Sequence, residues 1–187
     1  MKNYIDTFLD ETEKIIKSID RNQILAMAGA LKDLKRRNGR LFILGIGGSA
    51  ANASHAVNDF RKIADIETYA PTDNVSELTA WTNDIGFDVI FSNWLKTSRL
   101  SDKDALLIFS VGGGSEKTSG NLVLAMEYAK QKNAAILAIV SRNGGAALKM
   151  ADVCILIPVI SNDRITPHAE SWQAVLWHLV VNAIIRK

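Results

Sequence analysis

The sequence has few prolines, a single cysteine and no long apolar run. Three prolines in 187 residues leave no room for a proline-rich linker. Cys154, the only cysteine, cannot form an internal disulfide, so we expect a reducing, cytoplasmic compartment. No apolar run approaches the roughly 20 residues of a membrane span, and the acidic segment at the start does not resemble a signal peptide. We therefore expect neither disulfides nor a membrane-spanning segment.

Charge of either sign is not in excess. Twenty-two Lys and Arg residues are balanced by twenty Asp and Glu residues, for a net charge of +2. This balance argues against a dedicated nucleic-acid-binding protein. Apolar residues make up 48% of the chain and charged residues 22%, which excludes a disordered chain. We expect one domain over residues 1–187, large enough to bury a core without disulfides.

Two kinds of hydrophobic pattern organise the chain. Residues 1–37 carry apolar stripes at helical spacing with a break at 20–22, which predicts a pair of helices. Beyond them, short apolar runs alternate with helical patterns, which predicts a parallel sheet with helices on both faces and ligand sites after residues 44, 109 and 140. The expected strands are 41–44, 66–70, 105–109, 134–140 and 153–157, and the expected helices are 50–63, 76–98 (broken near Asn83), 117–132, 144–150 and 168–186.

Two glycine-rich segments follow predicted strands. Residues 45–50 read G-I-G-G-S-A, and residues 110–115 read S-V-G-G-G-S. Glycines let the backbone approach a ligand, and the following helix offers free N–H groups to an anion. The first segment suits a small phosphorylated or hydroxylated ligand, a dinucleotide or a plain turn, although the acidic residue that a dinucleotide site needs comes late, at Asp73. For the second, phosphate is the natural ligand because Ser110 and Ser115 can donate hydrogen bonds, and a flexible turn is the alternative.

Two pairs of residues each combine a histidine with a carboxylate. His55 and Asp59 lie four residues apart on one predicted helix, and Glu170 and His178 lie eight apart on the last helix. Each pair therefore shares a helix face. Together they could bind a metal or form an acid–base site. Taken alone, the first pair would more often be a solvated surface contact, and a histidine between two large apolar residues would more often be buried in the core.

These segments resemble the sugar isomerase (SIS) domain family, and within it the bacterial phosphoheptose isomerases. The resemblance covers nearly the whole chain. Residues 45–55 are similar to the family's G-N-G-G-S-A-A-x-A-x-H, and residues 110–115 occupy the place of its S-T-S-G-N-S phosphate loop. Further matches are residues 76–87 with its S-x-L-T-A and N-D-x-G-F, 144–145 with its G-G, 151–152 with its A-D, and 166–178 with its T-P-R-I-Q…H.

The resemblance implies a fold and an assembly. The expected α/β fold is a five-stranded parallel sheet flanked by helices in three layers, similar to flavodoxin. The two N-terminal helices, within residues 1–37, would serve packing or oligomerisation. Members of the family are usually homotetramers whose active sites are shared between subunits.

The resemblance also implies a reaction and roles for residues. Members convert sedoheptulose 7-phosphate to D-glycero-D-manno-heptose 7-phosphate through an enediol, and supply heptose for lipopolysaccharide or capsule. Asp59 and His178 would be the catalytic carboxylate and histidine, which suits a reaction that moves a proton between adjacent carbons. The implied substrate contacts are Gly47, Gly48, Ser49, Asn83, Asp84, Ser110, Gly112, Ser115 and Glu170. The implied ligands of one zinc ion per subunit are His55, Asp59, Glu170 and His178.

Several residues around the expected site depart from the family pattern. Asp59 stands where the family has Glu, and Glu170 stands where it has Gln. In the phosphate loop, Gly112 and Gly114 replace Ser and Asn. Three interpretations follow: a heptose 7-phosphate isomerase, an isomerase of another sugar phosphate, or a non-catalytic SIS tetramer that binds a sugar phosphate or a replication-initiator protein.

Overall fold

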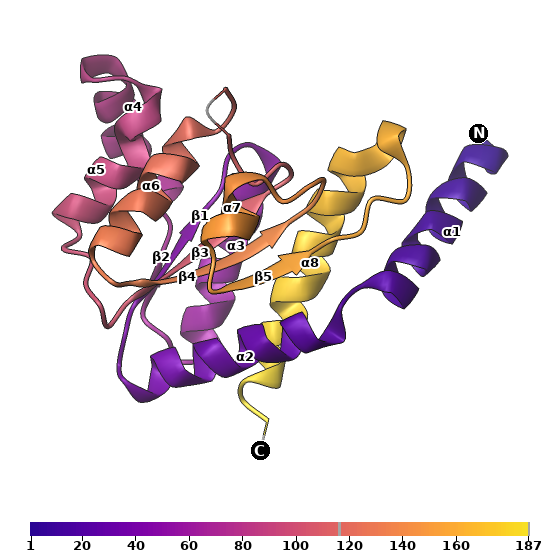
Figure 1. Ribbon diagram of the computed structural model, residues 1–187, viewed down its shortest axis with the longest axis horizontal. Coiled ribbons are helices and arrows are strands. Elements are labelled where there is room, and N and C mark those ends of the chain that lie inside the picture. The colour runs from indigo at the N-terminus through magenta and orange to yellow at the C-terminus, as the bar shows by residue number, and fades with distance from the viewer. Residues whose placement is uncertain (116, 187) are drawn as a thin grey trace.

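A five-stranded parallel sheet lies at the centre of the computed structural model, which describes residues 1–115 and 117–186 (Figure 1). The strand order is β2-β1-β3-β4-β5, so the chain reverses direction across the sheet between β1 and β3, where ligands bind in such folds. This confirms the predicted fold class. The strands are β1 (Leu41–Leu44), β2 (Thr68–Tyr69), β3 (Ala105–Ser110), β4 (Ala135–Val140) and β5 (Val153–Leu156).

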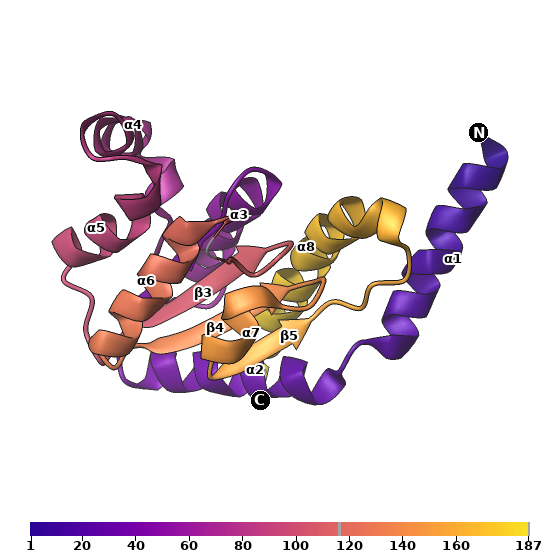
Figure 2. The same ribbon diagram turned by 45° about the horizontal axis from the view of Figure 1, so that its top comes forward.

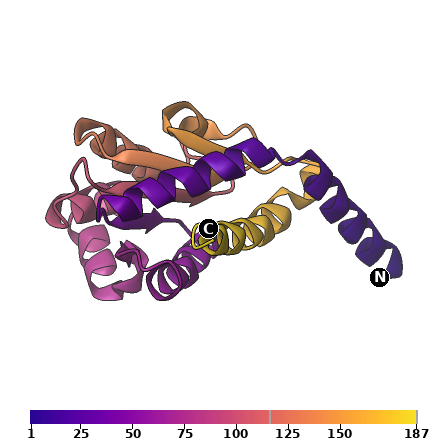
Figure 3. The same ribbon diagram turned by 90° about the horizontal axis from the view of Figure 1, so that it is seen from below.

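Helices cover both faces of the sheet. One face carries α2 (Arg21–Arg36), α3 (Gly48–Lys62) and α8 (Ile165–Ala183), as Figure 3 shows from below. The other face carries α5 (Ile90–Thr97), α6 (Gly120–Gln131) and α7 (Gly145–Met150). The remaining helices, α1 (Lys2–Ser18) and α4 (Val75–Asp84), project from opposite ends of the molecule (Figure 2). None of the helices in the described ranges combines the length and apolarity that a bilayer crossing requires.

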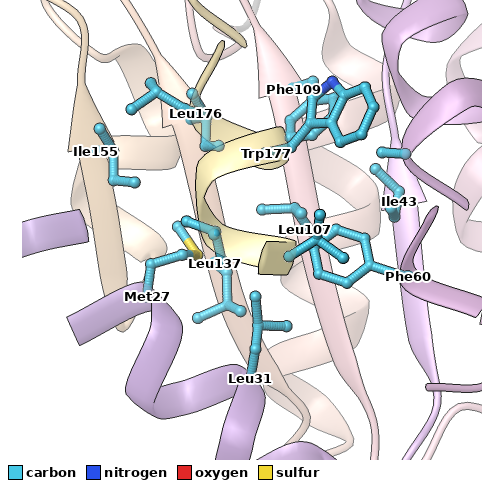
Figure 4. Close-up of a cluster of buried hydrophobic side chains, with 14 of the residues drawn as sticks. Met27, Leu31, Ile43, Phe60, Leu107, Phe109, Leu137, Ile155, Leu176 and Trp177 are labelled. Carbon is cyan, nitrogen blue, oxygen red and sulfur yellow. The ribbon is translucent and has the colours of Figure 1, made fainter. Parts of the chain in front are cut away.

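The apolar runs form strands because both of their faces are buried. Successive side chains of a strand point to opposite faces, so Ile43 and Leu107 face one helical layer while Phe42 and Leu106 face the other. Figure 4 shows the first of these cores, between the sheet and helices α2, α3 and α8. A strand with helices on both sides has no solvent-facing position, which explains the near-continuous apolar runs. The labelled side chains include Leu31, Ile43, Phe60, Leu107, Phe109, Leu137 and Trp177.

Several element boundaries differ from those expected. The helix expected from residue 117 begins at Gly120, because the Ser115 amide donates to the Thr118 carbonyl in a turn that delays it. The last helix begins earlier than expected, at Ile165, and accepts Pro167 because a proline costs little in the first turn. The strand expected at 66–70 shrinks to two residues. The break expected near Asn83 is confirmed, since α4 ends at Asp84.

Helix α1 leaves much of its predicted apolar stripe in solvent. Ile15 is fully buried, but Ile5, Leu9 and Ile16 are 51%, 61% and 47% exposed. The helix extends away from the sheet, so that apart from its C-terminal part only a few side chains, including Phe8 and Glu11, reach the rest of the molecule (Figure 1). The exposed face leaves apolar area available for another molecule.

A buried charge cluster joins α1 to the start of α8. Arg164 donates two hydrogen bonds to the Glu11 carboxylate, with N···O distances of 2.8 and 2.7 Å. His168 Nε2 lies 2.9 Å from the same carboxylate, and the Phe8 ring stacks on the His168 ring. Hydrogen bonds from Arg164 and His168 lower the pKa of Glu11 to about 2. The cluster therefore holds α1 against the segment that leads into α8.

We expect Glu11→Gln to lower Tm by several degrees at neutral pH, because it leaves Arg164 and His168 facing a neutral amide. The Glu11 pKa is about 2 in the folded protein and ordinarily 4.5, so the ionised carboxylate stabilises the fold fully above pH 4.5 and progressively less as the pH falls toward 2. Calorimetry across this range should show the Tm gap between the variant and the unmodified protein shrinking with acidity. Glu13→Gln, at an exposed pair with Lys17, is the control. A gap independent of pH would contradict the prediction.

Candidate active site

A pocket of about 460 Å³ opens at the carboxyl ends of β1, β3 and β4. It lies where the sequence predicted ligand sites, because the parallel register brings the ends of β1, β3 and β4 to one edge. Three loops, one from each strand, contribute to its walls. The lining residues are Ile46, Ser49, Phe109, Ser110, Val111, Gly112, Gly114, Ser115, Thr118, Ser119, Arg142, Asn143 and Gly145.

The first glycine segment turns the chain from β1 directly into α3. Gly47 has φ of +62° and stands just before the helix, a conformation that favours glycine. Gly45 is required by close packing, because a Cβ there would overlap the Ser49 carbonyl. The turn places the buried Ser49 in the pocket wall, whereas Gly47 and Gly48 are exposed beside it.

The second glycine segment forms a compact loop around two serine hydroxyls. Ser110 Oγ accepts a hydrogen bond from the Gly113 amide at 3.0 Å, and Ser115 Oγ accepts one from the Thr118 amide at 3.1 Å. Because each hydroxyl oxygen is an acceptor here, its own proton can still be donated to an anion. Gly112 also lines the pocket. The loop therefore has the donors that the phosphate interpretation requires.

Sequence reasoning missed four lining residues: Thr118, Ser119, Arg142 and Asn143. Thr118 and Ser119 were assigned to a helix that in fact starts after them, so they belong to the loop. A signal was present, since Ser-Gly ahead of an apolar run is typical of a helix start. Arg142 and Asn143 follow β4 at the edge where the fold rule places ligands.

His55, Asp59 and His178 form a cluster between α3 and α8. One nitrogen or oxygen from each of the three side chains lies within 4.8 Å of the others, and His178 Nε2 is 3.9 Å from Asp59 Oδ2. The Asp59 side chain is 14% exposed and that of His178 is 45% exposed. His178 is therefore not a buried core histidine, and Asp59 is more than a solvated surface residue.

The surroundings of His178 determine which ring nitrogen faces Asp59. His178 Nδ1 lies 2.7 Å from the carbonyl oxygen of Ala174, and a carbonyl can only accept, so Nδ1 carries a proton. Nε2 is then free to take up a proton or bind a metal. Trp177 stacks on the His178 ring at 3.4 Å and meets His55 edge-on. Trp177 and Phe109 belong to the same buried core, and Phe109 also lines the pocket, whereas His55, Asp59 and His178 do not line it.

Glu170 stands apart from this cluster. Its carboxylate lies against Gly48, where a Cβ would overlap it, in the first turn of α3. His55 is seven residues further along the helix, about 10 Å away along its axis. Asn52 ties the two helices together by donating to the Glu170 carbonyl at 2.9 Å. The expected fourth metal ligand therefore faces the positive end of the α3 dipole instead.

Asn83 and Asp84 are not brought to the pocket within this chain. Both are exposed in the last turn of α4, where the Asn83 amide donates to the Asp84 carboxylate at 2.8 Å. Helix α4 projects from the body beyond α5 and α6 (Figure 2). The expectation that these two residues hold sugar hydroxyls is therefore not met by the pocket of a single subunit.

Comparisons with known proteins agree with this architecture. Residues 3–141 match the SIS domain family model. The lincomycin biosynthesis protein LmbN of Streptomyces lincolnensis is 32% identical, over 93% of this chain and 66% of that protein. A phosphoheptose isomerase of Rhodospirillum rubrum is 30% identical, over 86% of this chain and 84% of that protein.

Solved structures show the same fold. The phosphoheptose isomerase of Neisseria gonorrhoeae superposes with a TM-score of 0.84 at 24% identity, covering 98% of this chain and 97% of that one. That of Francisella tularensis also gives 0.84, at 23% identity, covering 100% of this chain and 96% of that one. With the family model matching well over half of the residues, this chain belongs to the SIS domain family.

Proposed function

We propose that the protein is a ketose–aldose isomerase that converts sedoheptulose 7-phosphate to D-glycero-D-manno-heptose 7-phosphate through an enediol. The observations that carry the proposal are the approach of His178 Nε2 to the Asp59 carboxylate at 3.9 Å, from two different helices, and the pocket at the start of α3, whose loop has phosphate-type donors. Relatives at about 30% identity that are named phosphoheptose isomerase support the choice of substrate. The product would supply heptose for lipopolysaccharide or capsule.

The chemistry requires a proton carrier and a partner that stabilises it. Isomerisation removes a proton from one carbon, passes through an enediol and returns a proton to the neighbouring carbon, while a hydroxyl proton moves between the two oxygens. His178 Nε2 is the atom suited to carry this proton, since Nδ1 is committed to Ala174. The Asp59 carboxylate at 3.9 Å stabilises the protonated ring and keeps it oriented. The remaining predicted contacts, including Ser49 and Glu170, would hold sugar hydroxyls.

Phosphate binding supplies the energy that positions the reacting end. Ser110, Gly112 and Ser115 would hold the phosphate group through hydroxyl and backbone donors. Contacts to a remote, non-reacting group can orient the carbonyl end at the proton carrier. The phosphate loop and the Asp59–His178 pair thus serve different parts of one substrate.

We also propose that His55, Asp59 and His178 can hold a zinc ion, which would take the place of the proton on His178 Nε2, since that nitrogen cannot bind a metal and carry a proton at once. Two imidazoles and a carboxylate are a donor set that zinc favours, and three protein ligands leave a position open for substrate. Such an ion would polarise the substrate carbonyl. Glu170 would join this set only by leaving Gly48.

We expect the zinc-loaded protein to retain about one ion per subunit after dialysis and the His55→Ala variant to lose most of it, since two remaining ligands bind zinc weakly. Elemental analysis measures the content without reference to activity. Glu127→Gln removes an exposed carboxylate on α6, in the opposite helical layer, and should leave the zinc content unchanged. Equal zinc in His55→Ala and the unmodified protein would rule out this site.

The test of the function is an isomerisation assay with sedoheptulose 7-phosphate, run with added zinc and with chelator, following aldose formation. Turnover supports the proposal, and a difference between the two conditions shows whether the metal is needed. Binding without turnover would contradict it and favour the alternatives, an isomerase of another sugar phosphate or a non-catalytic binding protein. The retained Asp59 and His178 favour the first of these, whereas the loss of phosphate-loop side chains at Gly112 and Gly114 favours the second, so other ketose phosphates belong in the same assay.

We further propose that residues 1–187 act as one SIS domain in a cytoplasmic homotetramer, with the helices of residues 1–37 at subunit contacts. An apolar groove of about 340 Å³ runs between α1, α2 and α8, lined by Ile16, Ile19, Arg21, Ile24, Trp172, Leu176 and Leu179. Shared active sites would also let Asn83 and Asp84 serve a neighbouring subunit's pocket. Light scattering measures the mass in solution, and the mass of one 20.5 kDa chain would contradict the proposal.

A further inference from the structure

Arg142 is the only residue with an ionisable acidic or basic side chain among the described residues that line the pocket. It follows β4, facing a loop that begins at Ser110. The Ser141 amide donates to the Val111 carbonyl at 3.1 Å, which sets the two loops side by side. Arg142 itself has a left-handed backbone, with φ of +52°. The chain thus adopts an uncommon conformation where this side chain enters the pocket wall.

Further backbone hydrogen bonds connect the segment after Arg142 to the second glycine loop, residues 110–115. The amides of Ala146 and Ala147 donate to the carbonyls of Gly114 and Gly113, each at 2.9 Å. A Cβ on Gly113 would overlap the Gly144 carbonyl. The two loops therefore form one packed unit, and the position of Arg142 relative to Ser110 and Ser115 does not depend on a mobile connection.

The Arg142 side chain passes close to Gly112, the position at which the family pattern has a serine. Its Cδ lies 3.9 Å from where a Cβ of residue 112 would stand, an ordinary contact distance. No carboxylate of residues 1–115 or 117–186 forms an ion pair with its guanidinium. Gly112 and Gly114 lack the side-chain donors that Ser and Asn supply at these positions in the family pattern. The Arg142 side chain, which carries a positive charge, lies beside Gly112.

We infer that Arg142 binds the phosphate of the substrate and supplies the charge that replaces the missing hydroxyl and amide. This inference rests on the proposed function. A guanidinium donates two parallel hydrogen bonds to phosphate, whereas a serine donates one without charge. The pocket should therefore discriminate strongly in favour of the phosphate dianion and against an uncharged sugar end.

The experiment compares Arg142→Met, Arg142→Lys and the unmodified protein in calorimetric binding of inorganic phosphate and in the isomerisation assay. Arg142→Met should weaken phosphate binding by about 10- to 100-fold, and should raise KM by a similar factor while kcat changes little, since the contact is made in the ground state and the transition state alike. Arg142→Lys should recover part of the lost phosphate affinity, because lysine restores the positive charge but not the two parallel hydrogen bonds of a guanidinium.

Arg99→Met is the matched control. Arg99 is also exposed and also has a left-handed backbone, with φ of +53°, but it follows α5 and does not line the pocket. Its replacement should leave phosphate binding and KM unchanged. The thermal transitions of all variants should coincide with that of the unmodified protein, so that lost binding reports on the site.

The outcomes separate this inference from the proposed function. Phosphate binding that depends on Arg142 supports the inference even if sedoheptulose 7-phosphate is not turned over, in which case the proposed function alone fails. Equal phosphate affinity in Arg142→Met and the unmodified protein overturns the inference and leaves the isomerase standing. If the unmodified protein binds neither inorganic phosphate nor the sugar phosphate, the pocket is not a phosphate site and both fail.

Discussion

Replacing His178 with alanine should lower kcat by about 10²- to 10⁴-fold, the range for loss of a positioned proton carrier. His178 Nε2 faces the Asp59 carboxylate at 3.9 Å, and Nδ1 is committed to the Ala174 carbonyl. His168 cannot substitute, because it is buried against Glu11. Binding of the sugar phosphate should persist, since the proposed phosphate contacts lie in the pocket loops.

Replacing His178 could lower turnover by removing the proton carrier or by weakening zinc binding. Two measurements separate these effects. Zinc content is measured in His178→Ala, and kcat is compared between His178→Ala and His55→Ala with zinc in excess. If Asp59 and His178 act as a unit, then the double variant Asp59→Asn, His178→Ala should have a kcat only slightly lower than that of His178→Ala alone. Val175→Ala, at an exposed position of the same helix, controls for the fold. Unchanged turnover in His178→Ala would remove this residue from the mechanism.

Replacing Gly113 with alanine should cost about 3 kcal/mol of stability and abolish measurable phosphate binding. Gly113 has φ of +75°, which alanine adopts at a cost of about 1–2 kcal/mol, and the new Cβ would overlap the Gly144 carbonyl, a backbone atom. Overpacking adds about 1–3 kcal/mol. To relieve the overlap, the loop of Ser110 must move away from that of Arg142, so the phosphate donors no longer converge. For a chain of this size, Tm should fall by about 10 °C.

Two other glycines provide controls that divide this effect into its parts. Gly47 has φ of +62° but open space around a new Cβ, so the stability of Gly47→Ala reports on backbone strain alone. Gly29 lies inside α2 with nothing near a new Cβ, so Gly29→Ala should stabilise the protein by about 1 kcal/mol. Gly113→Ala should be less stable than Gly29→Ala. Wild-type Tm and phosphate affinity in Gly113→Ala would show that the two loops are not coupled as the structure indicates.

The parallel sheet could be predicted from the sequence, because strands that are buried on both faces have an apolar pattern that few other structures share. A parallel strand covered on both faces must be apolar at almost every position, and the runs at 41–44 and 105–109 meet that demand. The boundaries were less predictable, because the turn after Ser115 depends on hydrogen bonds of both the Ser115 amide and its hydroxyl with Thr118, which helical periodicity does not reveal.

The candidate site could be predicted only in part from the sequence. The spacing of His55 and Asp59 places both on one face of a helix, and the structure indeed brings them together. The partner His178 is far away in the chain, and its approach to Asp59 depends on how α3 packs on α8. The same packing turns Glu170 toward Gly48 and away from the cluster, which helical spacing alone could not reveal.

By itself, the sequence determined the strand and helix alternation, the glycine loops at the carboxyl ends of strands, and the residue types available for proton transfer. These follow from periodicity and from backbone chemistry, which act over a few residues. Only the tertiary structure decided that Asp59 meets His178, that Asn83 and Asp84 lie outside the pocket, and that Arg142 stands beside the phosphate loop. Those outcomes depend on the packing of segments distant in the chain, where burial and close contact, and not local preference, select the arrangement.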